Sequence, residues 1–124
     1  MPRDATAEEV LAYLRDQHAP LDDLAAWTRA AVLTADPDLT ERVYRGWRGI
    51  GFRHREGGLV CAIYPRGESV VLLFEYGAEL ADPDGILLGE GTQTRFLRVE
   101  RPEPALRDRI TRYVQQAIAE RLLR

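Results

Sequence analysis

The segment from residue 104 to residue 122 constrains the fold of this chain more than any other. Its arginines lie mostly outside one apolar stripe, and Pro104 suits the first turn of a helix. The stripe consists of residues at steps of three and four, namely Leu106, Ile110, Tyr113, Val114, Ala117, Ile118 and Leu122. Because such a stripe must be buried against another layer, we expect an amphipathic helix that lies on a sheet.

Four extended segments with turn signals between them predict that sheet. The segments are rich in β-branched and aromatic residues and cover residues 47–54, 59–64, 70–76 and 95–101. Glu56-Gly57-Gly58 and Pro65-Arg66-Gly67-Glu68 predict the first two turns, and such short connections favour antiparallel pairing. The segment 70–76 is almost entirely apolar, which is typical of a central strand covered on both faces.

Two amphipathic helices are predicted before the sheet. Thr6 and Glu9 have the spacing of a capping box that begins a helix ending near His18. The residue before Pro20 is pushed out of helical geometry, so a second helix is expected from about Leu21.

The break at residues 36–38 leads into one more expected helical turn, from Asp38 to about Tyr44. The predicted fold is therefore α+β in the order α-α-β-β-β-loop-β-α, in one domain over residues 1–124. Its mostly antiparallel sheet is packed by the N-terminal helices and by the C-terminal amphipathic helix.

Charge and hydropathy limit the classes of partner. The net charge is −3 with both signs interspersed, which argues against a nucleic-acid binder that relies on bulk electrostatics. No apolar run approaches the roughly 20 residues that span a bilayer, so no membrane partner is expected. The first ten residues lack the apolar core of a signal peptide, and Cys61 is the one cysteine. Both features favour a reducing, cytoplasmic setting.

Catalytic motifs are absent from the sequence. His18 and His54 are the two histidines, and no serine, cysteine or histidine stands in the spacing of a known nucleophile–base or zinc motif. Cys61 alternates with Leu59 and Ile63, which indicates a core position. The sequence therefore favours a binding protein over an enzyme.

The connection 77–93 suggests one kind of site. Carboxylates gather in and near it, and hard divalent cations such as ferrous iron accept oxygen ligands. The candidate metal ligands are Glu79, Asp82, Asp84 and Glu90. The alternative interpretation is that these are solvated surface acids.

The segment around residue 47 suggests another kind of site. Tyr44 and Trp47 flank a glycine-rich, arginine-bearing stretch, so a small-molecule or small-anion pocket with an arginine at its mouth is a hypothesis. The candidate ligand-binding residues are Tyr44, Trp47, Arg48 and Arg95. The alternative is a structural or homo-oligomeric module, since glycines in a strand let another backbone approach closely.

Residues 73–98 carry a recurrent pattern. An apolar strand is followed by Gly77-Ala78-Glu79-Leu80-Ala81-Asp82-Pro83, then by Leu87-Leu88-Gly89-Glu90-Gly91, and then by Arg95, which opens the last strand. This pattern, with the terminal helix, resembles the YdhG-like domain family, which is largely of unknown function. One branch of that family is described as a bacterial frataxin-like iron chaperone. The resemblance implies a binding protein for iron or a small ligand, and it supplies no catalytic residues.

Overall fold

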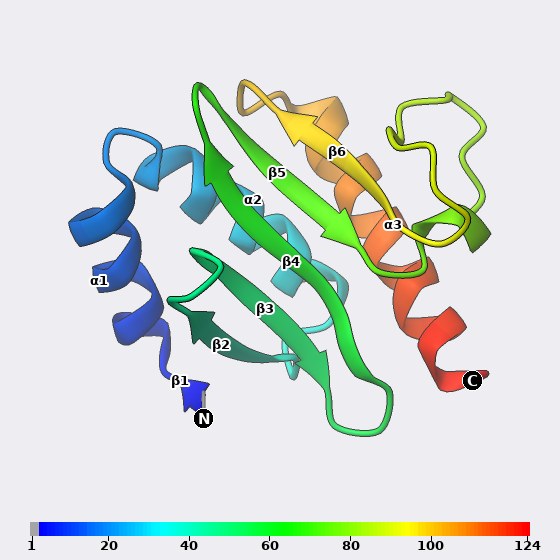
Figure 1. Ribbon diagram of the computed structural model, residues 1–124, viewed down its shortest axis with the longest axis horizontal. Helices are drawn as coiled ribbons and strands as arrows, with labels where there is room; N and C mark the ends of the chain where they lie inside the picture. The colour runs from blue at the N-terminus through cyan, green and yellow to red at the C-terminus, as the bar shows by residue number, and fades with distance from the viewer. Residues whose placement is uncertain (1–2) are drawn as a thin grey trace.

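The computed structural model describes residues 3–124, which form one antiparallel sheet and three α-helices (Figure 1). The sheet has six strands in the order β1-β2-β3-β4-β5-β6, so each strand pairs with its neighbours in sequence. The strands are β1 (Asp4–Ala5), β2 (Thr40–Tyr44), β3 (Gly49–His54), β4 (Gly58–Arg66), β5 (Ser69–Phe74) and β6 (Arg95–Val99). The helices are α1 (Ala7–His18), α2 (Asp22–Ala35) and α3 (Pro104–Leu122), with a short 3₁₀ helix, η1 (Gly77–Glu79), after β5.

The α+β class and the predicted order of helices and sheet are confirmed. Helices α2 and α3 pack against each other and cross behind the strands, whereas α1 lies against α2 and β2 (Figure 1). None of the helices within residues 3–124 combines the length and the apolar character needed to cross a bilayer.

The hydrophobic core lies between the sheet and the helices. Register pairs Ile50 with Ile63 and Ile63 with Leu72, and all three side chains are fully buried on the helix-facing side. Ile110 and Val114 of α3 are equally buried, as the apolar stripe predicts. Every second residue of a strand faces the helices, and residues three or four apart on α3 face the sheet. These two apolar faces pack together to form the core.

Cys61 belongs to the same core, as its alternation predicts. Burial raises the pKa of its thiol, so the thiolate form that reacts with electrophiles is disfavoured.

The opposite side of the sheet, which we call the open face, is not covered by a helix (Figure 1). Register assigns these residues of β2–β6 to it: Thr40, Arg42, Tyr44, Gly49, Gly51, Arg53, Leu59, Ala62, Tyr64, Arg66, Ser69, Val71, Leu73, Phe96 and Arg98. The expectation that residues 70–76 are covered on both faces is wrong, because Val71 and Leu73 are only half-buried. No helix reaches this side of β5, so their neighbours on the open face provide the cover.

The predicted helical turn from Asp38 to Tyr44 is also wrong. Residues 40–44 form β2, which pairs with β3 in the register Glu41 to Phe52 and Val43 to Ile50. Pairing with a neighbouring strand satisfies the backbone groups of five residues, whereas one helical turn would satisfy far fewer. The two-residue strand β1, which pairs with β2, carries no signal in the sequence.

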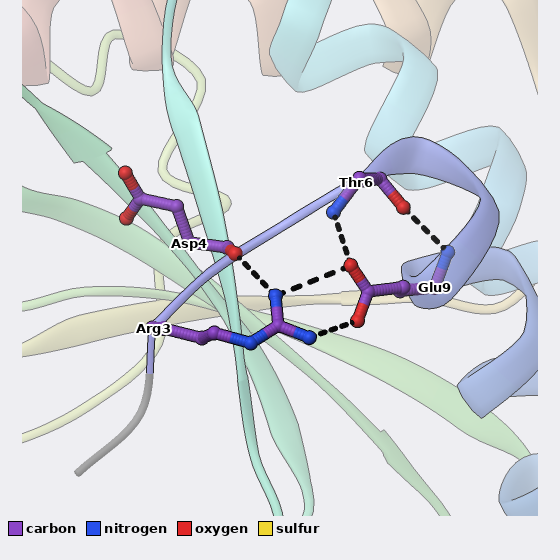
Figure 2. Close-up of polar contacts among 4 residues, drawn as sticks. All are labelled: Arg3, Asp4, Thr6 and Glu9. Atoms are coloured by element: carbon purple, nitrogen blue, oxygen red, sulfur yellow. Dashed lines mark hydrogen bonds and ion pairs between the residues drawn. The ribbon is translucent and has the colours of Figure 1, made fainter.

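The start of α1 is confirmed as a capping box (Figure 2). The Thr6 hydroxyl accepts a hydrogen bond from the Glu9 amide at 3.1 Å, and the Thr6 amide donates to the Glu9 carboxylate at 3.2 Å. Arg3 adds a contact that the sequence does not indicate, because its Nη2 donates to Glu9 Oε2 at 2.6 Å. This bond from Arg3, with the bonds from Thr6, lowers the pKa of Glu9 to about 2.

Candidate functional site

The turn between β2 and β3 holds Arg48 in an unusual conformation. Residues 45–48 form the turn, and the Arg48 amide donates to the Arg45 carbonyl at 3.3 Å. Arg48 has a φ of 55°, in the left-handed region that glycine tolerates best. For a residue with a Cβ this conformation costs about 1 kcal/mol. A large side chain retained under such strain marks a candidate functional position.

Aromatic rings lie flat on the sheet beside this turn, over two glycines. A Cβ on Gly49 would stand 2.7 Å from the Ile63 carbonyl oxygen and 2.9 Å from the Tyr64 ring, and one on Gly51 would stand 2.6 Å from the Tyr44 ring. The glycines therefore provide the floor on which Tyr44 and Tyr64 rest.

Trp47 forms the outer layer of this arrangement. Its ring stacks on that of Tyr44, with centroids 4.0 Å apart and planes 17° apart, and it is tilted against Tyr64 at 5.3 Å. Trp47 is 36% exposed, which is high for so large an apolar side chain. Its outer face is therefore available to a ligand.

Three guanidinium groups lie near the turn, Arg66 beside these rings and Arg45 and Arg48 toward α1. The Arg45 guanidinium lies 5.2 Å from the centre of the Tyr13 ring, and the Arg66 guanidinium lies 5.1 Å from that of Tyr64. Arg48 Nη2 donates to the Gln17 carbonyl at 3.3 Å, and Arg66 Nη2 donates to the Trp47 carbonyl at 3.3 Å.

None of these three arginines forms an ion pair with a carboxylate of residues 3–124. Their positive charge is therefore not neutralised within the described chain. We call the group the arginine–aromatic cluster, and its members are Tyr13, His18, Tyr44, Arg45, Trp47, Arg48, Tyr64 and Arg66.

A buried polar pair lies beneath this charge. His18 Nε2 and the Tyr13 hydroxyl are hydrogen-bonded at 2.9 Å, and both side chains are buried. Burial lowers the pKa of His18, and the positive charges of Arg48 and Arg66 lower it further. The part of this shift that comes from Arg48 and Arg66 reflects positive charge at the end of α1, which an anion would neutralise.

Of the four predicted ligand-binding residues, Tyr44 and Trp47 stack on each other, and Arg48 follows Trp47 in the same turn with its guanidinium on the Gln17 carbonyl. Arg95 lies elsewhere, opposite Phe74 on the helix-facing side of the sheet. Its Nη1 donates to the carbonyls of Gly91 at 2.6 Å and Thr94 at 2.8 Å. The position of Arg95 thus indicates that it fastens the long connection and does not join the cluster.

Sequence reasoning did not assign Tyr13, His18 or Arg66 to this site. Tyr13 and His18 are contributed by α1 and Arg66 by the end of β4, so only the folded chain brings them to the turn. The one local signal is the i, i+2 spacing of Tyr64 and Arg66, which places both on one side of a strand.

The predicted metal ligands have separate partners. Glu79 pairs with Arg124 at 2.6 Å, Asp84 pairs with Arg109 at 3.4 Å, and Glu90 is exposed. Within residues 3–124, no three His, Cys, Asp or Glu side chains are grouped so that they could hold one metal ion. An iron site at these residues stays a prediction that rests on the sequence resemblance.

Asp82, the fourth of these residues, fastens the connection 77–93 to α3. Its Oδ1 accepts from the Tyr113 hydroxyl at 2.5 Å and from the Ile86 amide at 3.1 Å, and its Oδ2 accepts from the Leu87 amide at 3.1 Å. Burial opposes ionisation, but the bonds from Tyr113 and the backbone amides outweigh it and lower the pKa of Asp82. These bonds hold the half-buried Ile86 and Leu87 against the core.

We therefore expect Asp82→Asn to lower the free energy of unfolding by about 2 kcal/mol at neutral pH, because hydrogen bonds to a charged group are lost. The folded-state pKa is the lower one, so Asp82 stabilises the fold above its unfolded-state pKa. That contribution is lost as the pH falls through the folded-state value. Urea unfolding at a series of pH values measures both effects.

The matched control for this measurement is Asp84→Asn, which removes the same charge from a half-exposed surface pair and should cost less than about 1 kcal/mol. The difference between the Asp82→Asn and wild-type proteins should shrink on acidification. A constant difference from neutral to acid pH would contradict the assigned role.

No family model, no curated protein and no solved structure matches this chain. The fold and the cluster define it as an α+β protein with a sheet covered by helices on one side only and with unneutralised arginines beside stacked aromatic rings. The resemblance to the YdhG-like family stays a prediction.

Proposed function

We propose that the protein binds a small anion carrying a flat ring at the arginine–aromatic cluster. The observation that carries the proposal is the set of Arg45, Arg48 and Arg66, which have no carboxylate partner in residues 3–124 and lie in or beside the turn that carries the stacked Trp47. Guanidinium forks match the geometry of carboxylates and phosphates. The exposed outer face of the indole ring suits a stacked ring on the same ligand.

The conformation of Arg48 supports a role in binding. Glycine at this position would relieve the left-handed strain and would remove the guanidinium in one change. Stability and binding should therefore respond in opposite directions, which a purely structural arginine would not produce.

The position of His18 predicts how binding depends on pH. Protonation of His18 adds positive charge beside Arg48, so an anion should bind more tightly as the pH falls through the pKa of His18. By reciprocal linkage, a bound anion should raise the pKa of His18. A titration of the His18 ring resonances by NMR, with and without ligand, reads this out directly.

The central test compares Arg48→Gly with wild type in titrations with phenyl phosphate. A Trp27→Phe background leaves Trp47 as the one tryptophan, so its fluorescence reports the site. We expect Arg48→Gly to weaken binding about tenfold, which is about 1.4 kcal/mol. The same variant should be as stable as wild type or more stable, with a free energy of unfolding higher by up to about 1 kcal/mol. Urea unfolding measures this difference.

The controls separate the charge of the ligand from its ring. Inorganic phosphate and benzyl alcohol, which each carry one of the two features, should bind more weakly than phenyl phosphate. Arg107→Ala removes an exposed arginine from α3 and should leave affinity unchanged. Equal affinity of wild type and Arg48→Gly for phenyl phosphate, with no shift of His18, would refute the proposal.

A cytoplasmic setting is part of the proposal. It is supported by the single cysteine, Cys61, which is buried in the core and needs no oxidising compartment.

A further inference from the structure

The open face of β2–β6 carries charged side chains of one sign, although acidic and basic residues are interspersed along the sequence. Across β2–β6, all its charged residues are arginines, namely Arg42, Arg53, Arg66 and Arg98, although the chain as a whole carries a net charge of −3. Among the residues that the structure describes, Arg42 is the one of these four with an acidic partner, Asp4 of β1, at 3.0 Å. The bulk charge, which argues against nucleic acid, therefore does not describe this surface.

Aromatic side chains lie between these arginines. Tyr44, Tyr64 and Phe96 are half-buried on the open face, and Trp47 covers one end of it. Two guanidiniums lie over rings, Arg66 over Tyr64 at 5.1 Å and Arg98 over Phe96 at 5.6 Å. Rings and cations thus lie together on β2, β4 and β6, with the apolar Val71 and Leu73 of β5 between the last two.

The size and charge of the open face disfavour a globular partner and a second copy of the chain. Five strands at about 4.8 Å spacing, most of them about 17 Å long, cover roughly 400 Å². A stable protein interface needs about 800 Å² on each partner. Two copies joined through this face would oppose arginine to arginine, which costs free energy.

An extended acidic peptide fits the face less well than a nucleic-acid strand. The peptide gains most of its affinity from main-chain hydrogen bonds at a sheet edge. On the open face the backbone groups of β2–β5 already pair with strands on both sides, and at the outer edge of β6 Phe96 is already paired with Leu88. A nucleic-acid strand needs only ring faces for its bases and cations for its phosphates.

We propose that the open face binds single-stranded nucleic acid, with bases on Trp47, Tyr64 and Phe96 and phosphates on Arg66 and Arg98. The strand crosses the sheet from β2 to β6 over about four nucleotides, the lower end of known single-strand sites. This inference rests on the proposed function at one end only, where Trp47 and Arg66 belong to both surfaces. A duplex hides the faces of its bases and lacks this mode of binding.

The test uses fluorescein-labelled hexamers of uridine and of thymidine with the whole protein, followed by fluorescence anisotropy at several salt concentrations. Both hexamers should bind, and the logarithm of the association constant should fall with that of salt with a slope of about −0.7 for each phosphate contacted. Arg98→Ala should weaken binding several-fold and make the slope about 0.7 less steep. Arg107→Ala on α3 is the control with the same change of charge and should alter neither quantity.

The outcomes separate this inference from the proposed function. Arg98→Ala, at the far end of the sheet, should leave phenyl phosphate binding unchanged. Phenyl phosphate binding without binding of either hexamer would overturn the nucleic-acid inference and leave the proposed function standing. A duplex or an octaglutamate peptide that binds as tightly as the hexamers would also overturn it, as would equal effects of Arg98→Ala and Arg107→Ala.

Discussion

Replacing Glu41 by alanine is expected to lower the free energy of unfolding by about 3–5 kcal/mol. Glu41 lies on the helix-facing side of β2 and accepts two hydrogen bonds from Arg29 of α2, from Nε to Oε2 and from Nη2 to Oε1, both at 2.7 Å. The side chains are 7% and 14% exposed, so the pair is almost withdrawn from water. Alanine would leave the Arg29 guanidinium buried without its counter-charge, and that uncompensated charge is the source of the loss.

Urea unfolding of Glu41→Ala and of the double variant Arg29→Met/Glu41→Leu tests this explanation. The double variant should recover most of the lost stability, because apolar side chains of similar size remove both charges together. Arg101→Ala disrupts an ion pair that is 76% and 59% exposed and should cost less than about 1 kcal/mol. A double variant as unstable as Glu41→Ala would show that the loss comes from packing and not from the unpaired charge.

Gly49→Ala should be the second most damaging of the proposed changes, with a loss of about 1–3 kcal/mol. Its Cβ would stand 2.7 Å from the backbone oxygen of Ile63 in the neighbouring strand. Because this oxygen belongs to the backbone, the clash is relieved only if β3 and β4 move apart. The same Cβ would push the Tyr64 ring, so the stack that includes Trp47 should also be disturbed.

Gly46→Ala, three residues away in the turn, is the matched control. No atom lies within 4 Å of a Cβ at Gly46, so this variant should keep its stability. Thermal unfolding measures the loss, and near-ultraviolet circular dichroism of the aromatic residues reports the disturbance of the stack. Equal melting temperatures for the two variants would show that β3 and β4 accommodate the extra carbon.

Helices were predictable from the sequence because their signals are local. Thr6 and Glu9 cap α1 through residues three positions apart, and the stripe from Leu106 to Leu122 lies along one helix. The strand β2 was not predictable, because Glu41 and Val43 are fixed by their partners Phe52 and Ile50 in β3. A strand that forms by pairing with a distant segment has no local sequence signal comparable to the capping residues of a helix.

The candidate site was predictable only where one segment contributes to it. Tyr44, Trp47 and Arg48 are within five residues of one another, and Trp47 does stack on Tyr44. Tyr13 and Arg66 join them through the packing of α1 and the register of β4, which a linear pattern does not show. The charge separation on the open face was hidden for the same reason, since Arg66 and Arg98 are distant in sequence and share a surface only through strand pairing.

The left-handed backbone at Arg48 also has an evolutionary consequence. Every arginine codon that begins with CG becomes a glycine codon by one nucleotide change, and glycine is the residue that this backbone geometry prefers. Selection for folding alone would therefore favour glycine at this position, by a route open to a single mutation. Among homologues that share this turn, the residue at position 48 should separate those that have kept the proposed binding function from those selected only for a stable fold.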